Sequence, residues 1–399
     1  MLSQPNDWST HRPMGNAQHS LTKDSQFKFN SYHQTLKEKK PSVRIHRKSI
    51  STPDLYNKDT STDELIMKAK KGDVSAQYQV GVYYQEQKND KESFKWFLLS
   101  AKNGNEISQN KVALCYETGK GVTKNKTESF KWYLKSAFKG YPTAQYNLAI
   151  SFERGIGVEK NLQEAMKWYL KASDQNHVKS QYNIAINYRD GIGVEKSSSH
   201  ALYYFKLSAK NGHPKSQFEV AEHYFDKEEY KEALKYYFLS ANQNNFPSQH
   251  KLGMCYREGF GVEKDEKISF KWFLKAAASG YHQSQYEIGM CYQNGLGVKQ
   301  NSKEANQWFM KSGKRGYLDS LFELSKNLVN GSGIEKDSRT GLRIMSEISQ
   351  KGHVESQYQI AVCYEQGIGF EQNPQKAFEI FQKLADKGHK KSILKLNEY

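Results

Sequence analysis

AQYNLAISFERGIGVEKNLQEAMKWYLKASDQNH, residues 144–177, is one copy of a pattern that returns along most of the 399-residue chain. At its centre lies a Gly-x-Gly motif, Gly155-Ile156-Gly157, which occurs seven times, at intervals of 36 residues except for one of 68. A phosphate-cradling loop is needed only once and follows a strand, so seven regular copies indicate architecture and predict no cofactor site. The other six copies begin at Gly119, Gly191, Gly259, Gly295, Gly331 and Gly367.

The string Ser/Ala-Gln-Tyr aligns the copies, and positions below are counted from its second residue. That residue recurs at intervals of 32 or 36. The two short intervals contain residues 82–92 and 223–233, which lack Gly-x-Gly, so the loop is an optional part of the unit. A period of this length predicts stacked helical hairpins. The aligned residues are Gln77, Gln109, Gln145, Gln181, Gln217, Gln249, Gln285, Leu321 and Gln357.

Each unit is predicted to contain two helices. In the first, aliphatic, small and aromatic residues stand at +3, +4 and +7, which is one face of an α-helix. In the second, a small residue precedes a ring by three, as Ala165 precedes Trp168. The second helix ends at a glycine or asparagine, the residues that accept a left-handed backbone. Capping boxes are predicted for the pairs Asn125 and Glu128, Asn161 and Glu164, and Asn301 and Glu304.

This pattern resembles the Sel1-like repeat family, which is related to tetratricopeptide repeats. The resemblance covers roughly residues 62–399 and implies an all-α, right-handed α-solenoid of about nine hairpins that serves as an adaptor for other proteins. Half-units are expected at 62–72 and 389–399, which makes about 20 helices. The repeat departs from the family pattern toward its C-terminal end, at Leu321, Leu328, Ile344 and Ile380.

Two domains are expected: a basic Ser/Thr-rich tail, residues 1–60, and the repeat array, residues 61–399. The tail is poor in aliphatic residues, and this composition is typical of disorder. Ser49 follows Arg47-Lys48 and Ser51 precedes Pro53 by two, which makes Ser49 and Ser51 candidate phosphorylation sites.

The chain has 59 Lys and Arg against 43 Asp and Glu, a formal charge of +16. This excess favours acidic partners, although solubility alone also explains a lysine-rich helical surface. No apolar run is long enough to span a membrane, and no secretory signal or lipid-anchor motif is present. We therefore expect a cytoplasmic protein; a nuclear location, or a peripheral membrane location through a partner, is also compatible.

No catalytic or metal-binding set stands out. Every cysteine stands at +6. Equivalent positions in successive hairpins lie about one helix spacing apart, which is too far for a disulfide, so free, half-buried thiols are predicted. Histidines share one slot with tyrosines after the second helix, as His177 and Tyr141 do, which indicates packing between repeats. The chain is therefore expected not to be an enzyme, and to hold no metal. The cysteines are Cys115, Cys255, Cys291 and Cys363, and the other histidines of that slot are His213, His353 and His389.

The first candidate site lies on the first helices at +1, +5 and +8, the register that lines the concave groove in tetratricopeptide-like arrays. Rings, Met and Arg there are residue types enriched at protein interfaces. For the rings at +1, their regularity favours the alternative interpretation, in which they stack on the next hairpin as part of the core. The candidate groove residues are Tyr146, Ile150, Tyr182, Ile186, Arg189, Met254, Arg257, Tyr286, Met290 and Gln293.

The second candidate site is a lysine ladder on the second helices, with one row just before the ring and another one turn later. An acidic partner binding there would be released by salt, but an ordinary solvated face has the same composition. The pattern does not favour nucleic acid, because the core explains its aromatic residues. The first row is Lys95, Lys131, Lys167, Lys235 and Lys271, and the second is Lys135, Lys171, Lys275 and Lys311.

The function predicted from these features is a non-catalytic scaffold in signalling, which binds protein partners that carry acidic or extended segments. Two alternatives stay open. One is a regulatory subunit of a membrane-associated enzyme, since Sel1-like activators of chitin synthase have this shape, although many end in a prenylated cysteine that this sequence lacks. The other is an unrecognised hydrolytic enzyme with a pocket in the groove.

Overall fold

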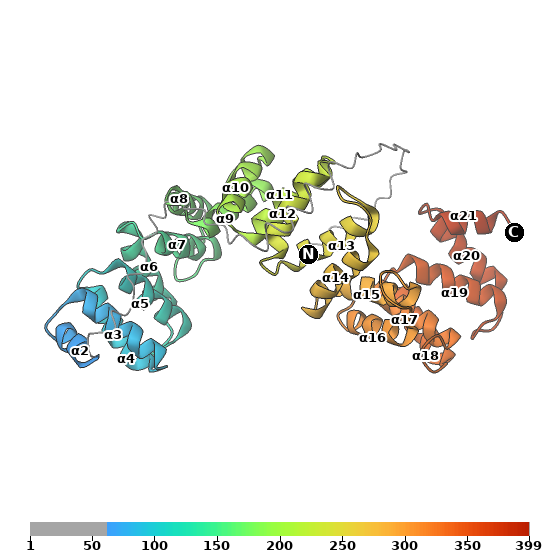
Figure 1. The fold of residues 1–399 in the computed structure, drawn as a ribbon, viewed down its shortest axis with the longest axis horizontal. Coiled ribbons are helices and arrows are strands. Elements are labelled where there is room, and N and C mark those ends of the chain that lie inside the picture. Colours follow the sequence, from blue (N-terminus) through green and yellow to red (C-terminus); the bar gives the residue numbers. More distant parts are fainter. Residues whose placement is uncertain (1–61, 399) are drawn as a thin grey trace. The chain divides into compact units, whose positions relative to one another are not determined.

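The computed structural model describes residues 62–398, which form 20 α-helices, with no strand among them (Figure 1). The predicted tail, with Ser49 and Ser51, lies outside these residues. Helix α2 (Thr62–Lys70) precedes nine hairpins and α21 (Lys390–Leu396) follows them. The first helices are α3 (Val74–Glu86), α5 (Glu106–Thr118), α7 (Pro142–Arg154), α9 (Val178–Asp190), α11 (Pro214–Asp226), α13 (Phe246–Glu258), α15 (His282–Asn294), α17 (Leu318–Asn330) and α19 (Val354–Gln366). The second helices are α4 (Asp90–Lys102), α6 (Lys126–Phe138), α8 (Leu162–Asp174), α10 (Ser198–Lys210), α12 (Tyr230–Ala241), α14 (Glu266–Ala278), α16 (Ser302–Gly313), α18 (Ser338–Gln350) and α20 (Pro374–Ala385).

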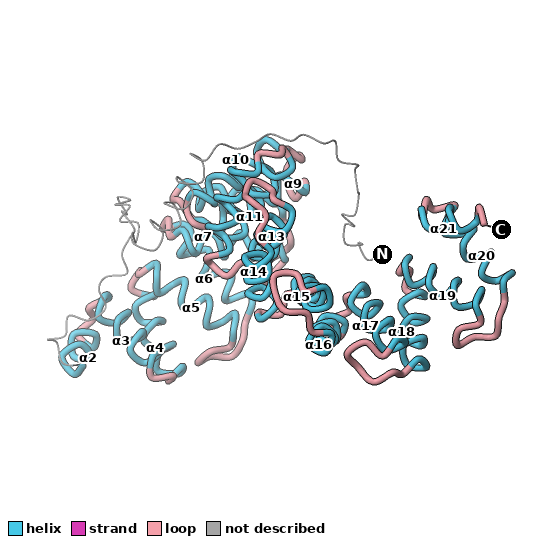
Figure 2. Tube along the Cα trace, turned by 45° about the vertical axis from the view of Figure 1, so that its right-hand side comes forward, coloured by secondary structure: helices cyan, strands magenta, loops and turns pink. Residues whose placement is uncertain are grey.

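The helices pack in chain order. Each one contacts mainly the helix before it and the helix after it, so that successive hairpins lie side by side (Figure 2). First helices also meet directly, as α15 and α17 do. This arrangement is an α-solenoid, and it confirms the predicted fold class.

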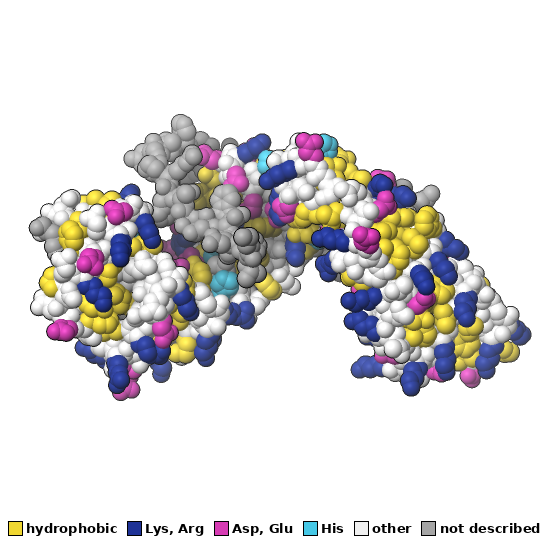
Figure 3. Space-filling model, turned by 180° about the vertical axis from the view of Figure 1, so that it is seen from behind, with side chains coloured by type: hydrophobic (Ala, Val, Ile, Leu, Met, Phe, Trp, Pro, Cys, Tyr) yellow, Lys and Arg dark blue, Asp and Glu magenta, His cyan; other side chains and the backbone are white. Residues whose placement is uncertain are grey.

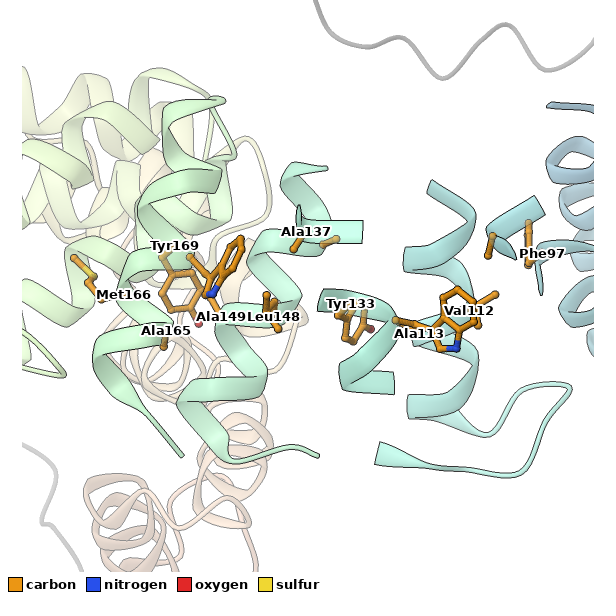
Figure 4. Packing of buried hydrophobic residues seen from close by; sticks show 14 of the residues in the cluster. Phe97, Val112, Ala113, Tyr133, Ala137, Leu148, Ala149, Ala165, Met166 and Tyr169 are labelled. Atoms are coloured by element: carbon orange, nitrogen blue, oxygen red, sulfur yellow. The ribbon is translucent and has the colours of Figure 1, made fainter. Parts of the chain in front are cut away.

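A ring packed on a small residue holds the two helices of a hairpin together. The glycines at +4 show how close the helices come, because a Cβ on Gly81, Gly253 or Gly289 would lie 2.4 to 2.6 Å from a ring carbon of the second helix. The other hairpins have alanine or serine there, and the ring is fully or nearly buried in all of them except the α17–α18 hairpin, which has the buried Met345 instead. Figure 4 shows this core around Ala149, Tyr133 and Tyr169.

The Gly-x-Gly loop has two separate requirements for glycine. Gly155 ends α7 with φ 66°, a left-handed cap. Gly157 has φ 71°, and a Cβ on it would lie 2.1 Å from the carbonyl oxygen of Lys126, in the first turn of the preceding second helix. The motif is therefore a contact between hairpins. The two short turns close instead with Lys88 and Glu228 at φ 56° and 61°.

The predicted capping boxes are half right. Asn161 Oδ1 accepts from the backbone N–H of Glu164 at 2.9 Å, and Asn125 and Asn301 cap in the same way. The reciprocal bond is wrong, because the cap N–H of Asn161 donates to the carbonyl of Phe152 at 2.8 Å. The loop brings that first-helix carbonyl to the cap, which leaves the Glu164 carboxylate to pair with Lys167.

The aligned glutamine joins one hairpin to the next. Gln145 Nε2 donates to the carbonyl of Ala137 at 3.3 Å, in the last turn of the preceding second helix. The same bond is made by Gln77, Gln109, Gln217, Gln249, Gln285 and Gln357, at 2.8 to 3.2 Å. The carbonyl of Ala137 also accepts from the backbone N–H of Gly140 at 3.0 Å, so the glutamine adds a second bond to it and links the two hairpins.

Candidate partner-binding surfaces

The rings at +1 are part of the packing between hairpins. Tyr146 lies 5.9 Å from the Tyr169 ring of its own hairpin and 4.8 Å from the His177 ring of the next. Tyr182 is placed in the same way between Phe205 and His213. Tyr286 lies between Phe309 and Tyr317. All three are half-buried, so only one edge of each ring is open to a partner.

The histidine slot is a helix cap as well as a packing position. His177 Nδ1 accepts from the backbone N–H of Ser180 at 3.3 Å and lies 2.9 Å from its hydroxyl. Burial lowers the pKa of His177 to about 4, and that of His213 likewise. These rings are therefore neutral near pH 7. No group of three or more metal-ligating side chains is found among residues 62–398.

The aliphatic groove candidates at +5 are half-buried against the core. Ile150, Ile186, Met254 and Met290 each pack on a buried cluster of their own hairpin or its neighbour. They form two apolar pairs on neighbouring first helices, separated by α11, which has Glu222 at +5.

The polar groove candidates at +8 pair with the next hairpin. Arg257 Nη1 lies 2.5 Å from Glu287 Oε2, and Arg189 Nη1 lies 3.3 Å from Glu219 Oε1. Gln293 Nε2 donates to Glu323 Oε2 at 3.2 Å. We name this row of +8 to +2 contacts the groove ladder.

Partners at +2 were missed in the sequence, although each stands 30 residues after the +8 residue that it meets. The pair Arg257–Glu287 is well shielded, with exposed side-chain fractions of 31% and 16%. Burial raises the pKa of Glu287, and the nearby Arg257 opposes this rise. The charged form of the carboxylate is therefore stabilised by the arginine. The groove ladder therefore serves the stacking of hairpins first.

The lysine ladder is exposed, and its two rows have different neighbours. In the first row, Lys131 lies 2.8 Å from Glu128 and Lys167 lies 2.6 Å from Glu164, both three residues back. Lys95 and Lys235 pair with Glu92 and Glu232 in the same way. Lys271 has Ile268 at that position, so α14 lacks the acidic residue.

In the second row the ammonium groups lie over tryptophan rings. The distances to the ring centroid are 4.3 Å for Lys135 on Trp132 and 4.0 Å for Lys171 on Trp168. Lys275 and Lys311 lie 5.2 and 4.0 Å from Trp272 and Trp308. A cation–π contact orients each lysine without cancelling its charge.

The two layers of the array carry opposite net charge. The nine first helices hold 8 basic and 14 acidic side chains, a net of −6. The nine second helices hold 21 basic and 10 acidic ones, a net of +11. In Figure 3, Lys and Arg border patches of hydrophobic side chains on the face in view. The second-helix face is therefore the one suited to an acidic partner.

The cysteine thiols of the array are unreactive. Burial raises the pKa of the Cys255 and Cys291 thiols to about 12, and that of Cys115 to about 11, so they are poor nucleophiles. The four cysteines are free. Two shallow pockets lie at the loops, around Gly295–Lys299 and Gly119–Thr123. Their polar groups are loop and helix-end groups, and they do not form a catalytic set.

A stack of helical hairpins with exposed charged faces places the chain in the class of helical-repeat solenoids. The Sel1 repeat family matches nine consecutive segments between residues 74 and 389, and the chain belongs to that family. This confirms the resemblance found in the sequence. Sel1 repeat proteins generally act as protein-interaction scaffolds.

Two solved structures support the same fold. The chain is similar to c5321, a protective antigen of uropathogenic Escherichia coli with an SLR fold, at 28% identity and a TM-score of 0.71, over 84% of this chain and 75% of that one. It is also similar in fold to a Sel1 repeat protein from Oxalobacter formigenes, at 24% identity and a TM-score of 0.59, over 77% and 92% of the two chains. A search of the curated proteins gave no match. Within residues 62–398, every helix is too short or too polar to cross a bilayer.

Proposed function

We propose that this protein is a non-catalytic scaffold whose repeat array, residues 61–399, binds acidic or extended segments of partner proteins. The observation that carries the proposal is the charge of the second-helix face, +11 against −6 on the first helices. The lysine ladder repeats this charge at regular spacing, and oriented rows of charge steer and align a partner.

The groove is the second surface in this proposal. The +1 rings and the groove ladder already contact the neighbouring hairpins. The part of the groove that a partner can contact is therefore the apolar edges of its +5 residues, which are Ile150, Ile186, Met254 and Met290. A role in signalling would place the basic tail, residues 1–60, under control of phosphorylation at Ser49 and Ser51, which would add negative charge there.

Proximity labelling with the full chain, followed by binding of the captured partners at two salt concentrations, tests the proposal. The charge-reversal variant Lys131→Glu/Lys167→Glu/Lys271→Glu should lose partners that salt also releases. Met254→Ala/Met290→Ala should keep those partners and lose any that use the groove. Circular dichroism checks that each variant is folded. The proposal would be contradicted by partners whose binding is unaffected by salt and by both variants. Specific turnover of a substrate would also contradict it.

A further inference from the structure

The lysine ladder is interrupted in its middle by apolar side chains. Where the other hairpins from α4 to α14 have a first-row lysine, α10 has Tyr203, which is 61% exposed. In the second row, α6, α8, α14 and α16 have a lysine, whereas α4, α10 and α12 have a leucine; Leu239 on α12 is 50% exposed, and α12 keeps its first-row Lys235. The acidic residue three before the lysine is also replaced in α10, by the exposed His200.

A second, independent feature changes at the same place. In the loops from Gly121 to Gly333, the second glycine lies against the first turn of the preceding second helix, as Gly157 does at Lys126 and Gly297 at Glu266. The hairpin that follows α10 has the short turn around Glu228 instead of this loop. The first turn of α10 therefore lacks this glycine contact, and its residues Ser198, Ser199 and His200 are exposed.

Basic helices lie on both sides of this interruption. On one side, Lys131 with Lys135 and Lys167 with Lys171 stand at i,i+4. On the other, Lys267, Lys271 and Lys275 form a run at the same spacing. Like charges at this spacing cost helix stability, so the helices do not gain from them. A partner that brings negative charge would relieve the repulsion. Helix α10 itself keeps Lys206, whose ammonium lies over the Tyr224 ring at 5.1 Å.

The spacing sets a lower limit on the length of the partner segment. Second helices of neighbouring hairpins each pack on the first helix between them, so they are at least one packing distance apart, about 10 Å. Helices α8 and α14 are three hairpins apart, so the two basic groups are separated by at least about 30 Å. An extended chain advances about 3.3 Å per residue, so at least about nine residues span that distance.

We propose that the second-helix face from α8 to α14 binds an extended partner segment with apolar side chains at its centre and acidic residues at both ends. The apolar side chains lie on Tyr203 and Leu239, and the acidic ends lie on the lysines of α8 and α14. This inference rests on the proposed scaffold function and specifies the ligand of its basic face.

The test uses the full chain and a fluorescein-labelled peptide of about 15 residues, with three glutamates at each end and Leu and Phe at the centre. A control peptide has the same composition with all glutamates at one end. Fluorescence anisotropy should show binding of the first peptide that falls with salt, and binding of the control peptide that is roughly tenfold weaker, because its charges meet only one basic group.

The variant Tyr203→Lys/Leu239→Lys makes the centre match the other hairpins, so it should fold. It should bind the first peptide roughly tenfold more weakly, because the apolar contact is lost. The matched control is Leu99→Lys on α4, an exposed leucine in the same row outside the site, and it should leave binding unchanged. Lys171→Glu/Lys275→Glu should weaken binding and flatten its dependence on salt.

Equal binding of the two peptides, or no effect of the double lysine variant, would overturn the proposed segment. Binding to vesicles with 30% phosphatidylserine but to neither peptide would overturn it in favour of a lipid surface. If the array captures partners through the lysines but binds neither peptide nor vesicles, this inference fails while the scaffold function stands.

Discussion

Gly313 and Leu321 complement each other at the junction of α16 and α17. Leu321 replaces the glutamine that joins the other hairpins, and a Cβ on Gly313 would lie 2.5 Å from its Cδ2 atom. Other hairpins have alanine or serine where Gly313 stands. A departure from the repeat at one position is thus compensated at another, eight residues away.

This compensation makes the two substitutions interdependent. Gly313→Ala alone should destabilise the array by about 1 kcal/mol, since overpacking outweighs the gain in helix propensity. Leu321→Gln/Gly313→Ala restores the pairing of the other hairpins and should be more stable than either single variant. Thermal unfolding of the four proteins measures the coupling, and purely additive effects would contradict it.

The glycines of the repeat should differ sharply in their sensitivity to substitution. Gly157→Ala forces a Cβ to within 2.1 Å of a backbone carbonyl and should cost more than about 3 kcal/mol. Gly140→Ala is the matched control, with positive φ but no atom within 4 Å, and should cost about 1 kcal/mol. Chemical denaturation of both variants tests this, and equal losses would mean that the loop does not bear on the preceding hairpin.

A largely buried histidine should make stability depend on pH. His250 lies between Phe273 and Tyr281, with Nδ1 2.9 Å from the Ser284 hydroxyl, and burial lowers its pKa to about 3. The folded state thus disfavours the proton that the unfolded chain binds below about pH 6.5. The contribution of the neutral His250 to the free energy of unfolding is fully present above that pH and is lost as the pH falls toward 3. The loss is on the order of 3 kcal/mol by pH 4.

The variant His250→Phe places at +1 the ring that other hairpins have there. Its melting temperature should fall less between pH 7 and pH 4 than that of the parent protein. His200→Phe changes an exposed histidine and serves as the control. If both variants followed the parent profile, His250 would not be the group responsible.

The groove ladder and the lysine ladder should differ in their effect on stability. Glu287→Ala removes the partner of Arg257 on the next hairpin and leaves it with Glu258 alone, so it should cost about 1 kcal/mol. Glu128→Ala removes an exposed partner of Lys131 and should cost less than about 0.5 kcal/mol. Urea denaturation measures both changes, and similar losses would show that the groove ladder is not structural.

The period and composition of the repeat were enough to predict most of the fold. Glycines at helix ends, small residues opposite rings and the number of helices follow from spacing alone, because each feature belongs to one hairpin. The bond of Gln145 to Ala137 and the pair Arg257–Glu287 were not predicted, because they join hairpins and depend on how these stack. The reciprocal half of the capping box failed for a similar reason, since the loop delivers the carbonyl of Phe152 to the cap of Asn161.

The candidate surfaces were predicted as rows of residues, and their chemistry came from neighbours in the structure. Lys131 and Lys135 look alike in the sequence, yet one pairs with Glu128 and the other lies on Trp132. Arg257 looked like a residue for partners and is held by Glu287. Which residues of a row are open to a partner is decided by these side-chain contacts.

Contacts restricted to adjacent hairpins also have a mechanical consequence. If the array is pulled by its two ends, the force passes through every junction in series, so the weakest one should open first. Each released hairpin would add a length of about 100 Å of extended chain while the remaining hairpins stay folded. The extension of the molecule under force would then increase in separate steps, one for each hairpin that unfolds.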